Sequence, residues 1–322
     1  MLVIAAPGQG AQAPGFLAPW LELPGFAGRL AAWSELAGCD LIRYGTTAGA
    51  DEITDTAVAQ PLLVAAAMAA AEALTGSLEQ TARQAGAAAG HSVGELAAGA
   101  IAGVISPEDA MRLTAVRGRA MAAAAAAEQT GMTAVLGGDE AEVIAAIEAC
   151  GLTPANINGA RQVVAAGTSE QLAAFAASPP PGARLRPLQV AGAFHTVHMA
   201  PAVTALRAAA DGVTIADPAI VLLSNRDGSA VRSGSDWLER IVTQVSAPVR
   251  WDDCMRAMAG LGASALIELP PAGTLAGLAR RALPELALAA VKTPGDLAAA
   301  RDLLASHGQA EQDRTWPPAA TR

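Results

Sequence analysis

Short apolar segments and longer helical segments alternate along most of this chain, and this alternation limits the folds that it can adopt. Apolar segments at 2–6, 220–224, 265–269 and 286–291 are separated by stretches with helical character. Parallel neighbouring strands need a crossover connection, which is usually a helix. The pattern therefore predicts an α/β fold in which helices cover both faces of a parallel sheet.

The alternation changes between residues 131 and 189. The predicted order there is strand, helix, strand, strand, helix, strand, which is the split arrangement of a ferredoxin-like unit. We therefore expect a small domain at 128–190, inserted into a larger domain formed by 1–127 and 191–308. Residues 309–322 mix polar residues, charge and two prolines without a period, and we expect a disordered tail.

Two predicted helices begin at a proline. Ser106 precedes Pro107 and two acidic residues, which is typical of a capped helix start, and this helix is expected to continue to about residue 127. Gln60-Pro61 predicts a helix that runs to about residue 75, with proline at its first position. A further helix is predicted over 198–210.

The composition excludes several classes of protein. Hydrophobic residues make up 52% and charged residues 16% of the chain, which excludes disorder over most of its length. The most apolar stretch, 62–74, is shorter than the roughly 20 residues that a bilayer requires and contains Glu72. The N-terminus lacks the basic and long apolar regions of a secretory signal. We therefore expect no membrane partner and a cytoplasmic location.

Charge and cysteine usage exclude further functions. The net charge is −9, whereas nucleic-acid binding needs clustered basic residues, so no nucleic-acid partner is expected. Twenty of the 21 basic residues are arginine, whose planar guanidinium group suits carboxylates and phosphates. Cys39, Cys150 and Cys254 are odd in number and widely spaced, which argues against a disulfide framework and a thiolate metal site.

The strongest chemical signal is Gly90-His91-Ser92-Val93-Gly94, which fits G-x-S-x-G between a predicted strand and a predicted helix. Small flanking residues allow a sharp turn that projects the serine Oγ, and the next amide points toward a developing oxyanion. The sequence therefore predicts Ser92 as a nucleophile. The alternative is a glycine-rich helix start in which Ser92 is only an N-cap.

A nucleophilic serine needs a base, and the chain has four histidines. His91 adjoins Ser92 on a tight turn, where its ring would point elsewhere, and His307 lies near the C-terminal end. His195 and His198 follow a predicted strand, where loops of an α/β sheet carry catalytic groups. We favour His195, because His198 begins the next predicted helix. No further ligand cluster supports a zinc site on this pair.

Arg117 is expected on the less polar face of the helix that begins at Pro107. A rotation of about 100° per residue places Thr114, Arg117 and Met121 on one face. An arginine there can hold a substrate carboxylate in a partly dry pocket more firmly than a lysine can. The alternative is that Arg117 reaches solvent or pairs with a structural acid.

The loop Gly8-Gln9-Gly10-Ala11-Gln12 looks like a phosphate cradle only at first sight. It lacks the GK[ST] ending of a P-loop and the G-x-G-x-x-G spacing of a dinucleotide site, so it gives only weak support for nucleotide binding. Its backbone amides could instead supply an oxyanion donor. No metal and no bound cofactor are expected.

Together these elements resemble the malonyl-CoA:acyl carrier protein transacylase family, whose motifs occur here in family order between residues 7 and 251. The matching motifs are Pro7-Gly8-Gln9-Gly10-Ala11-Gln12, Gly90-His91-Ser92-Val93-Gly94-Glu95, Val116-Arg117-Gly118-Arg119-Ala120-Met121, Asn156-Ile157-Asn158, Gln162-Val163-Val164, Gly192-Ala193-Phe194-His195-Thr196 and Gln244-Val245-Ser246-Ala247-Pro248-Val249-Arg250-Trp251. A further similar stretch is Glu268-Leu269-Pro270-Pro271-Ala272-Gly273.

The resemblance implies a large domain similar to an α/β-hydrolase core, a ferredoxin-like insert, and an active site between them. It implies that Ser92 is the nucleophile and His195 the base, oriented by the main-chain carbonyl of Gln244 instead of an aspartate. It implies that the amides of Gln9 and Val93 form the oxyanion hole. The residues implied in substrate binding are Arg117, which would hold the malonyl carboxylate, and Met121, His91, Gln162 and Phe194.

The activity implied by the resemblance has two half-reactions. Malonyl-CoA acylates Ser92, and the phosphopantetheine thiol of acyl carrier protein then takes the malonyl group, which predicts ping-pong kinetics and extender units for fatty-acid synthesis. The phosphopantetheine is carried by the two substrates and is no cofactor of the enzyme. Phe194 would crowd a branched acyl group, so malonyl is expected over methylmalonyl.

Other functions stay open at this point. A discrete polyketide-pathway acyltransferase would use the same chemistry, whereas a serine esterase or thioesterase would want a side-chain acid and gain nothing from a buried arginine. A carrier-docking protein with a degenerate site is a third alternative. Since acyl carrier proteins and this chain are both acidic, docking requires a local basic patch, for which Arg161, Arg184 and Arg186 are candidates.

Overall fold

The computed structural model describes residues 1–308, so the tail predicted at 309–322 lies outside the described residues. It is a mixed α/β structure with two sheets. The strands of the first sheet are β1 (Leu2–Ala6), β2 (Ala87–Gly90), β7 (Val221–Leu223), β8 (Ala230–Val231), β10 (Ala265–Glu268) and β11 (Ala287–Ala290). Those of the second are β3 (Thr130–Gly137), β4 (Thr153–Gly159), β5 (Gln162–Thr168), β6 (Ala183–Pro187) and β9 (Val249–Arg250).

Helices connect most of the strands. Those before residue 130 are η1 (Ala18–Glu22), α1 (Phe26–Ala37), α2 (Leu41–Thr46), α3 (Ala50–Thr54), α4 (Thr56–Thr75), α5 (Leu78–Gln84), α6 (Gly94–Ile101) and α7 (Pro107–Ala126). Those after it are α8 (Glu140–Ala149), α9 (Ser169–Ala177), η2 (Val197–Met199), α10 (Ala200–Ala210), α11 (Gly234–Gln244), α12 (Trp251–Gly260), α13 (Thr274–Ala282), η3 (Pro294–Asp296) and α14 (Leu297–His307).

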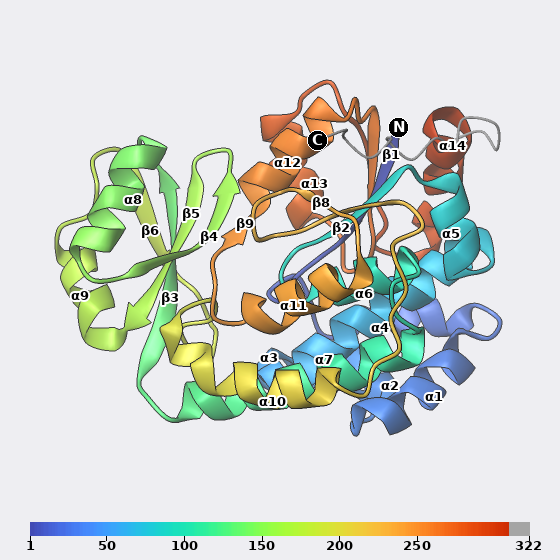
Figure 1. The fold of residues 1–322 in the computed structure, drawn as a ribbon, viewed down its shortest axis with the longest axis horizontal. Coiled ribbons are helices and arrows are strands. Elements are labelled where there is room, and N and C mark those ends of the chain that lie inside the picture. Colours follow the sequence, from blue (N-terminus) through green and yellow to red (C-terminus); the bar gives the residue numbers. More distant parts are fainter. Residues whose placement is uncertain (309–322) are drawn as a thin grey trace.

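The first sheet has the order β11-β10-β1-β2-β7-β8 and lies at the centre of the larger part of the molecule (Figure 1). Its first five strands are parallel, as the alternation predicts, whereas the short β8 pairs antiparallel with β7. Along β1, alternate residues enter two different hydrophobic clusters, one shared with α4 and α6 and the other with α12 and α13. Helices therefore cover both faces, which is why β1 is apolar at every position.

The second sheet has the order β6-β3-β5-β4-β9 and forms the smaller part on the left of Figure 1. Its strands β3 to β6 are antiparallel neighbours and come from residues 130–187, as the changed pattern predicts. The fifth strand, β9, comes from much later in the chain and pairs parallel with β4. This later segment therefore links the two sheets.

The proline signals have different outcomes. Ser106 caps α7 by accepting from the Asp109 amide at 3.0 Å, and Pro107 begins the helix, as predicted. The prediction for Pro61 is wrong, because α4 begins at Thr56 with Asp55 as its cap and contains Pro61. An aspartate that accepts from the Ala57 amide at 2.8 Å satisfies the helix start one turn earlier.

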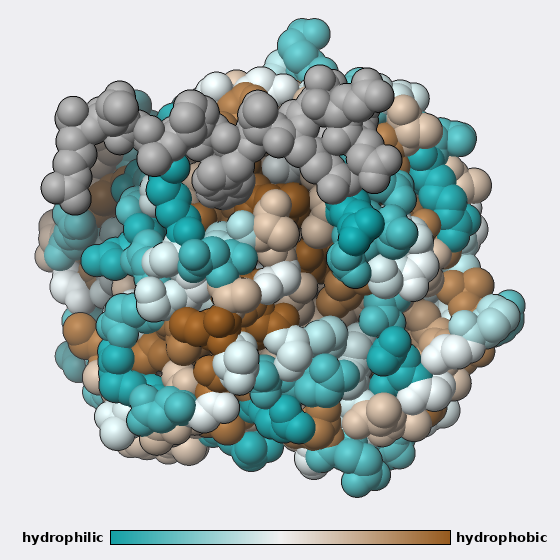
Figure 2. All heavy atoms as spheres, turned by 45° about the vertical axis from the view of Figure 1, so that its right-hand side comes forward, coloured by the Kyte–Doolittle hydropathy of each residue, from teal (hydrophilic) through white to brown (hydrophobic). Residues whose placement is uncertain are grey.

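The earlier start makes α4 20 residues long. The expectation that this segment is too short to cross a bilayer is therefore wrong, because the helix reaches the required length. By length and composition α4 alone among the described helices could cross a membrane. Most of it is buried against other helices in the core of the fold. On the face shown in Figure 2, hydrophilic side chains are interspersed with smaller hydrophobic areas.

The remaining differences concern the ends of helices and helices that the patterns do not predict. The segment predicted as one helix from His198 contains η2 before α10 begins at Ala200. The patterns do not predict η1, α1, α2 and α3, which occupy residues 18–54. Together with α4 they bury Trp20, Leu30 and Trp33 in the main cluster.

Candidate active site

The turn from β2 to α6 carries Ser92. β2 ends at Gly90, α6 begins at Gly94, and Ser92 between them has a left-handed φ of 53°. A Cβ on Gly90 would lie 2.0 Å from the Gly94 carbonyl carbon, and one on Gly94 would lie 2.3 Å from the Ala6 oxygen. Only glycine fits at these two positions, so the turn is as sharp as the motif predicts.

His195 meets Ser92 from a segment 103 residues later in the chain. Its Nε2 lies 2.7 Å from Ser92 Oγ, and its Nδ1 lies 2.8 Å from the main-chain oxygen of Gln244. Because a carbonyl only accepts, Nδ1 carries the proton and Nε2 is left to accept from the serine hydroxyl. The structure thus brings Ser92, His195 and the Gln244 carbonyl together in the predicted arrangement.

The surroundings keep His195 neutral. The residue is 3% exposed, and burial, together with the nearby charge of Arg117, lowers the pKa of His195 to about 3. The hydrogen bond to Gln244 opposes this shift. A neutral imidazole with a free Nε2 is the form that can act as a base.

Arg117 lies beside the same hydroxyl, on the buried face of α7. Its side chain is 1% exposed, and its Nη2 donates to Ser92 Oγ at 3.2 Å and to Gln244 Oε1 at 2.9 Å. Burial lowers the pKa of Arg117 to about 10, so it stays charged at neutral pH. Nε and Nη1 are buried and have no partner in the described residues, which leaves two donors for another acceptor.

Two backbone amides near Ser92 are also free. Gly8 packs against His91, since a Cβ on Gly8 would lie 2.8 Å from the His91 oxygen, so the 7–10 loop borders the Ser92 turn. Within residues 1–308, the amides of Gln9 and Val93 donate no hydrogen bond. The Gln9 side chain is held by Thr54 and Thr56.

The other residues predicted to bind substrate do not contact Ser92 in the hydrogen bonds of the described residues. Met121 is buried, and its Sδ accepts from Gln60 Nε2 at 3.4 Å. The His91 ring turns away from Ser92, as expected, and lies 2.9 Å from Asn158 Oδ1 on β4. Phe194 is buried directly before His195. Gln162 begins β5 and, among the described hydrogen bonds, makes none to Ser92, His195 or Arg117.

His198 does not join the site. Its Nδ1 lies 2.7 Å from Glu128 Oε2, whereas His195 faces Ser92, so the two histidines do not converge on one ion. In the part of the chain that the structure describes, no three His, Cys, Asp or Glu side chains group as metal ligands would.

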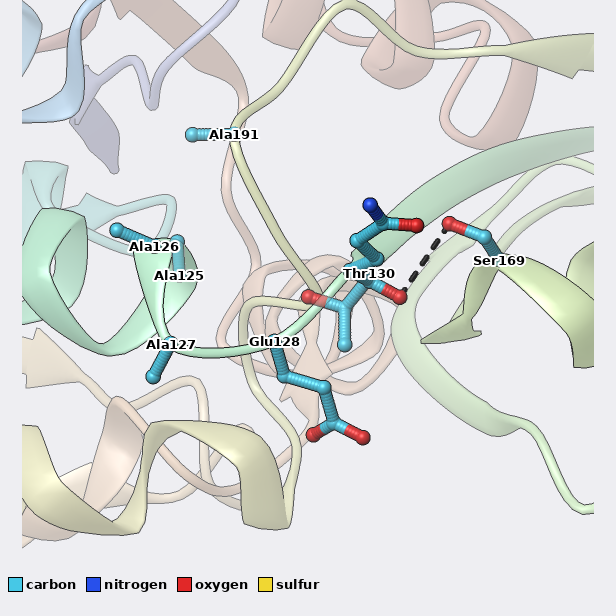
Figure 3. A pocket seen from close by; sticks show the side chains of 8 residues that line it. Ala125, Ala126, Ala127, Glu128, Thr130, Ser169 and Ala191 are labelled. Carbon is cyan, nitrogen blue, oxygen red and sulfur yellow. Dashed lines mark hydrogen bonds between the residues drawn. The ribbon is translucent and has the colours of Figure 1, made fainter.

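A cavity of about 400 Å³ lies where the chain passes from α7 to β3 and returns at Ala191 (Figure 3). Small side chains of Ala125, Ala126 and Ala191 line it, beside Glu128. The segments that join the two sheets form this cavity. Neither Ser92 nor His195 is among the residues that line it.

Two buried polar residues behind the Ser92 turn were not predicted from the sequence. Asn225, which follows β7, accepts from the Ser92 amide at 2.7 Å and donates to the Gly90 oxygen at 2.7 Å, so it holds the turn from both sides. Glu95 lies one residue into α6 and accepts from the Asn225 amide at 2.9 Å. Burial raises the pKa of Glu95 to about 8, against the opposing effects of that hydrogen bond and of Arg117.

Each missed residue had a local signal. Glu95 is the single charge in the otherwise apolar stretch 93–105, and Asn225 is a polar residue at the carboxyl end of an apolar strand. Functional groups of α/β sheets gather at such strand ends. Neither signal says which partner the side chain meets.

Comparisons with known proteins agree with this geometry. The family model of the acyl transferase domain matches residues 6–307. A malonyl CoA-acyl carrier protein transacylase of Mycobacterium tuberculosis is 52% identical over 297 residues, which cover 92% of this chain and 98% of that protein. The crystal structure of a Mycobacterium tuberculosis enzyme of this kind has a TM-score of 0.89 at 51% identity, covering 94% of this chain and 99% of the other.

A further solved structure adds a partner. A malonyl-transacylase in complex with its type II polyketide acyl-carrier protein has a TM-score of 0.85 and 29% identity, and the match covers 94% of this chain and 99% of that one. The shared fold extends over nearly the whole described chain, and the serine, histidine and arginine that the motifs predict meet within it. The chain therefore belongs to the acyl transferase family and, within it, to the malonyl CoA-acyl carrier protein transacylases.

Proposed function

We propose that this chain transfers malonyl from malonyl-CoA to the phosphopantetheine thiol of acyl carrier protein, supplying extender units for fatty-acid synthesis. The observation that carries the proposal is Arg117, a fully buried cation that touches Ser92 Oγ and has two unpartnered donors. A buried charge without a counter-ion is costly, and a substrate carboxylate would supply the missing acceptor. An acetyl group has no carboxylate to accept these hydrogen bonds.

In the first half-reaction, His195 Nε2 takes the Ser92 proton while Oγ attacks the thioester carbonyl of malonyl-CoA. The amides of Gln9 and Val93 hold the oxyanion, and one such donor commonly contributes about 3 to 4 kcal/mol in enzymes that form an oxyanion. The C–S bond then breaks, and the CoA sulfur leaves with the proton from His195. Malonyl remains as an ester on Ser92.

In the second half-reaction, the carrier thiol gives its proton to His195 and its sulfur attacks the malonyl ester. The C–O bond breaks, Ser92 recovers the proton, and the malonyl thioester leaves on the carrier. Gln244 supports both steps, since its carbonyl fixes the tautomer in which Nε2 accepts. No metal or bound cofactor enters either step, because the chain and its two substrates supply all the groups.

Two observations argue against a hydrolase. His195 Nδ1 faces a main-chain carbonyl where a triad would place an acid, and Arg117 would have no purpose toward an uncharged ester. A transacylase of a polyketide pathway has the same chemistry, and the complex with a type II polyketide carrier supports it as the second candidate. Of the two pathways, we propose fatty-acid synthesis as the first candidate. We also propose a cytoplasmic location for the protein.

The proposal includes the finer description of the fold. The parallel sheet of residues 1–127 and 191–308 serves as an α/β-hydrolase-like core, and 128–190 as a ferredoxin-like insert. The strand order β6-β3-β5-β4 supports the insert, and Asn158 on β4 beside His91 supports a site between the two. Met121, Phe194 and Gln162 are proposed to line the acyl pocket, with Phe194 excluding a methyl branch.

The test is the acyl-enzyme. On incubation with malonyl-CoA without carrier, the protein mass is expected to increase by one malonyl group, and Ser92→Ala should abolish the increase and lower transfer at least about 10⁴-fold, since triad nucleophiles carry effects of this size. Addition of acyl carrier protein should remove the adduct and load the carrier. Release of free malonate at the same rate with and without carrier would instead indicate a hydrolase.

A further inference from the structure

Glu95 is a buried carboxyl group that the two half-reactions do not use, and the donors at its two oxygens, the Asn225 backbone amide and Gln244 Nε2, match its ionised form against the effect of burial. Its side chain is 2% exposed, and every residue of α6 is buried around it. Burying a carboxylate costs free energy unless hydrogen bonds compensate for the lost water. The identity of its partners therefore indicates what it does.

Glu95 is bonded at both oxygens. Oε1 accepts from the Asn225 amide at 2.9 Å, and Oε2 accepts from Gln244 Nε2. No arginine, lysine or histidine of residues 1–308 forms an ion pair with it, although the charge of Arg117 is close enough to lower its pKa. Gln244 lies between the acid and Arg117 and bonds to both.

The Gln244 amide can face Arg117 in two ways. It can present Oε1, which accepts from Arg117 Nη2 at 2.9 Å, or it can flip and present Nε2, which would set two donors against each other. Glu95 Oε2 accepts from Nε2 and, together with a longer hydrogen bond from Nε2 to Asn225 Oδ1 at 3.4 Å, selects the first orientation. This holds Nη2 toward Gln244 and Ser92 and leaves Nε and Nη1 free.

We infer that Glu95 is a positioning residue for acyl selection: through the side chain of Gln244 it holds Arg117 in the orientation that receives a carboxylated acyl group. The inference rests on the proposed function, because it takes Arg117 as the carboxylate anchor. Glu95 touches neither the substrate nor the reacting atoms. Its loss should weaken malonyl binding more than it affects the reactivity of Ser92.

The central variant is Glu95→Gln. Glutamine keeps the shape but brings an NH2 group toward either the Asn225 amide or Gln244 Nε2, so one buried donor loses its acceptor. We expect KM for malonyl-CoA to rise about tenfold, with kcat changed less than about threefold. The preference for malonyl-CoA over acetyl-CoA should fall by a similar factor, while phenylmethanesulfonyl fluoride still labels Ser92 at close to the normal rate.

A second variant breaks the same chain of hydrogen bonds, from Glu95 through Gln244 to Arg117, at Gln244. Gln244→Met removes all three hydrogen bonds of the Gln244 side chain, to Arg117, Glu95 and Asn225. It keeps the main-chain carbonyl on His195. It should therefore reproduce the loss of preference even if Glu95→Gln fails to fold. The matched control is Glu268→Gln, since Glu268 is also fully buried and accepts three backbone hydrogen bonds at the start of α13. It should leave the preference unchanged.

Arg117→Ala separates the two hypotheses. If this variant keeps the malonyl preference, the proposed role of Arg117 is wrong. If Arg117→Ala loses the preference but Glu95→Gln or Gln244→Met keeps it, only the inference about Glu95 is wrong. An equal decrease in Ser92 labelling and in malonyl transfer for Glu95→Gln would also overturn it, because that would indicate general loss of packing.

Discussion

Both sheets of this protein pack against helices, but they contribute very differently to the site. The parallel sheet carries Ser92 after β2 and Asn225 after β7, and these strand ends are neighbours. The antiparallel sheet packs one face under α8 and α9 and its other face against the main core. Its one described hydrogen bond to the nucleophile turn joins Asn158 to His91.

The physical reason lies in strand direction. Parallel strands bring all their carboxyl ends to one edge, so loops from distant parts of the chain meet there. Antiparallel strands distribute their ends over two edges. The larger sheet therefore positions Ser92 and Asn225, and the smaller sheet supplies a wall and an outer surface.

Two asparagines, Asn225 after β7 of the larger sheet and Asn158 on β4 of the smaller one, test most strongly whether the larger sheet contributes more to the site. Asn225→Ala leaves the Ser92 amide and the Gly90 carbonyl without their partner, so transfer is expected to fall about a hundredfold. Asn158→Ala removes the single bond to His91 and should cost less than about fivefold. Rates of transfer, measured beside thermal unfolding of each variant, make the comparison.

Equal losses for the two asparagine variants would show that the smaller sheet takes part in the chemistry. A large loss for Asn225→Ala with an unchanged rate of Ser92 labelling would show that Asn225 does not hold the turn.

A smaller effect concerns acid stability in the larger part. The pKa of His195 is about 3 in the fold and about 6.5 in the unfolded chain, so between these values the unfolded state binds the extra proton and stability decreases as pH falls. From pH 7 to pH 5 this amounts to about 2 kcal/mol. Urea unfolding of the parent and of His195→Gln at both pH values should show a pH dependence weaker by that amount in the variant.

If His195→Gln has the same pH dependence as the parent, the histidine is not held neutral. His198→Gln is the control, because its side chain is partly exposed and pairs with Glu128 outside the site.

The smallest effect is expected on the outer surface of the smaller sheet. Arg184 and Arg186 are exposed on the edge strand β6 and have no acidic partner among the described residues. Reversing both to glutamate should raise KM for acyl carrier protein about three- to tenfold at low salt, and less at high salt. Acylation by malonyl-CoA should not change.

The control for this surface reverses Arg43 and Arg112, which are exposed on α2 and α7. If both double variants have the same effect, net charge and not a local patch guides the carrier.

Much of the site was predictable because its signals are local. The Ser92 turn needs glycine at two positions close to Ser92, Gly90 and Gly94. The cap Ser106 is followed directly by the proline that begins α7, and a helical period of 3.6 residues puts Arg117 on the buried face of that helix. The start of α4 was missed because a proline at the first position of a helix and one in its first turns look alike in sequence. The aspartate that caps α4, Asp55, lies six residues before the predicted first position, Pro61, and decides between them.

The sequence by itself therefore determined most of the strands of the two sheets, the Ser92 turn and the residue types of the site, because each depends on neighbours a few positions away. Only the tertiary structure decided that Glu95 and Asn225, 130 residues apart, bond to each other, and that Gln244 joins them to Arg117. It also decided that β9 joins the second sheet. Partners of buried polar groups depend on which elements pack together, and no local pattern contains that information.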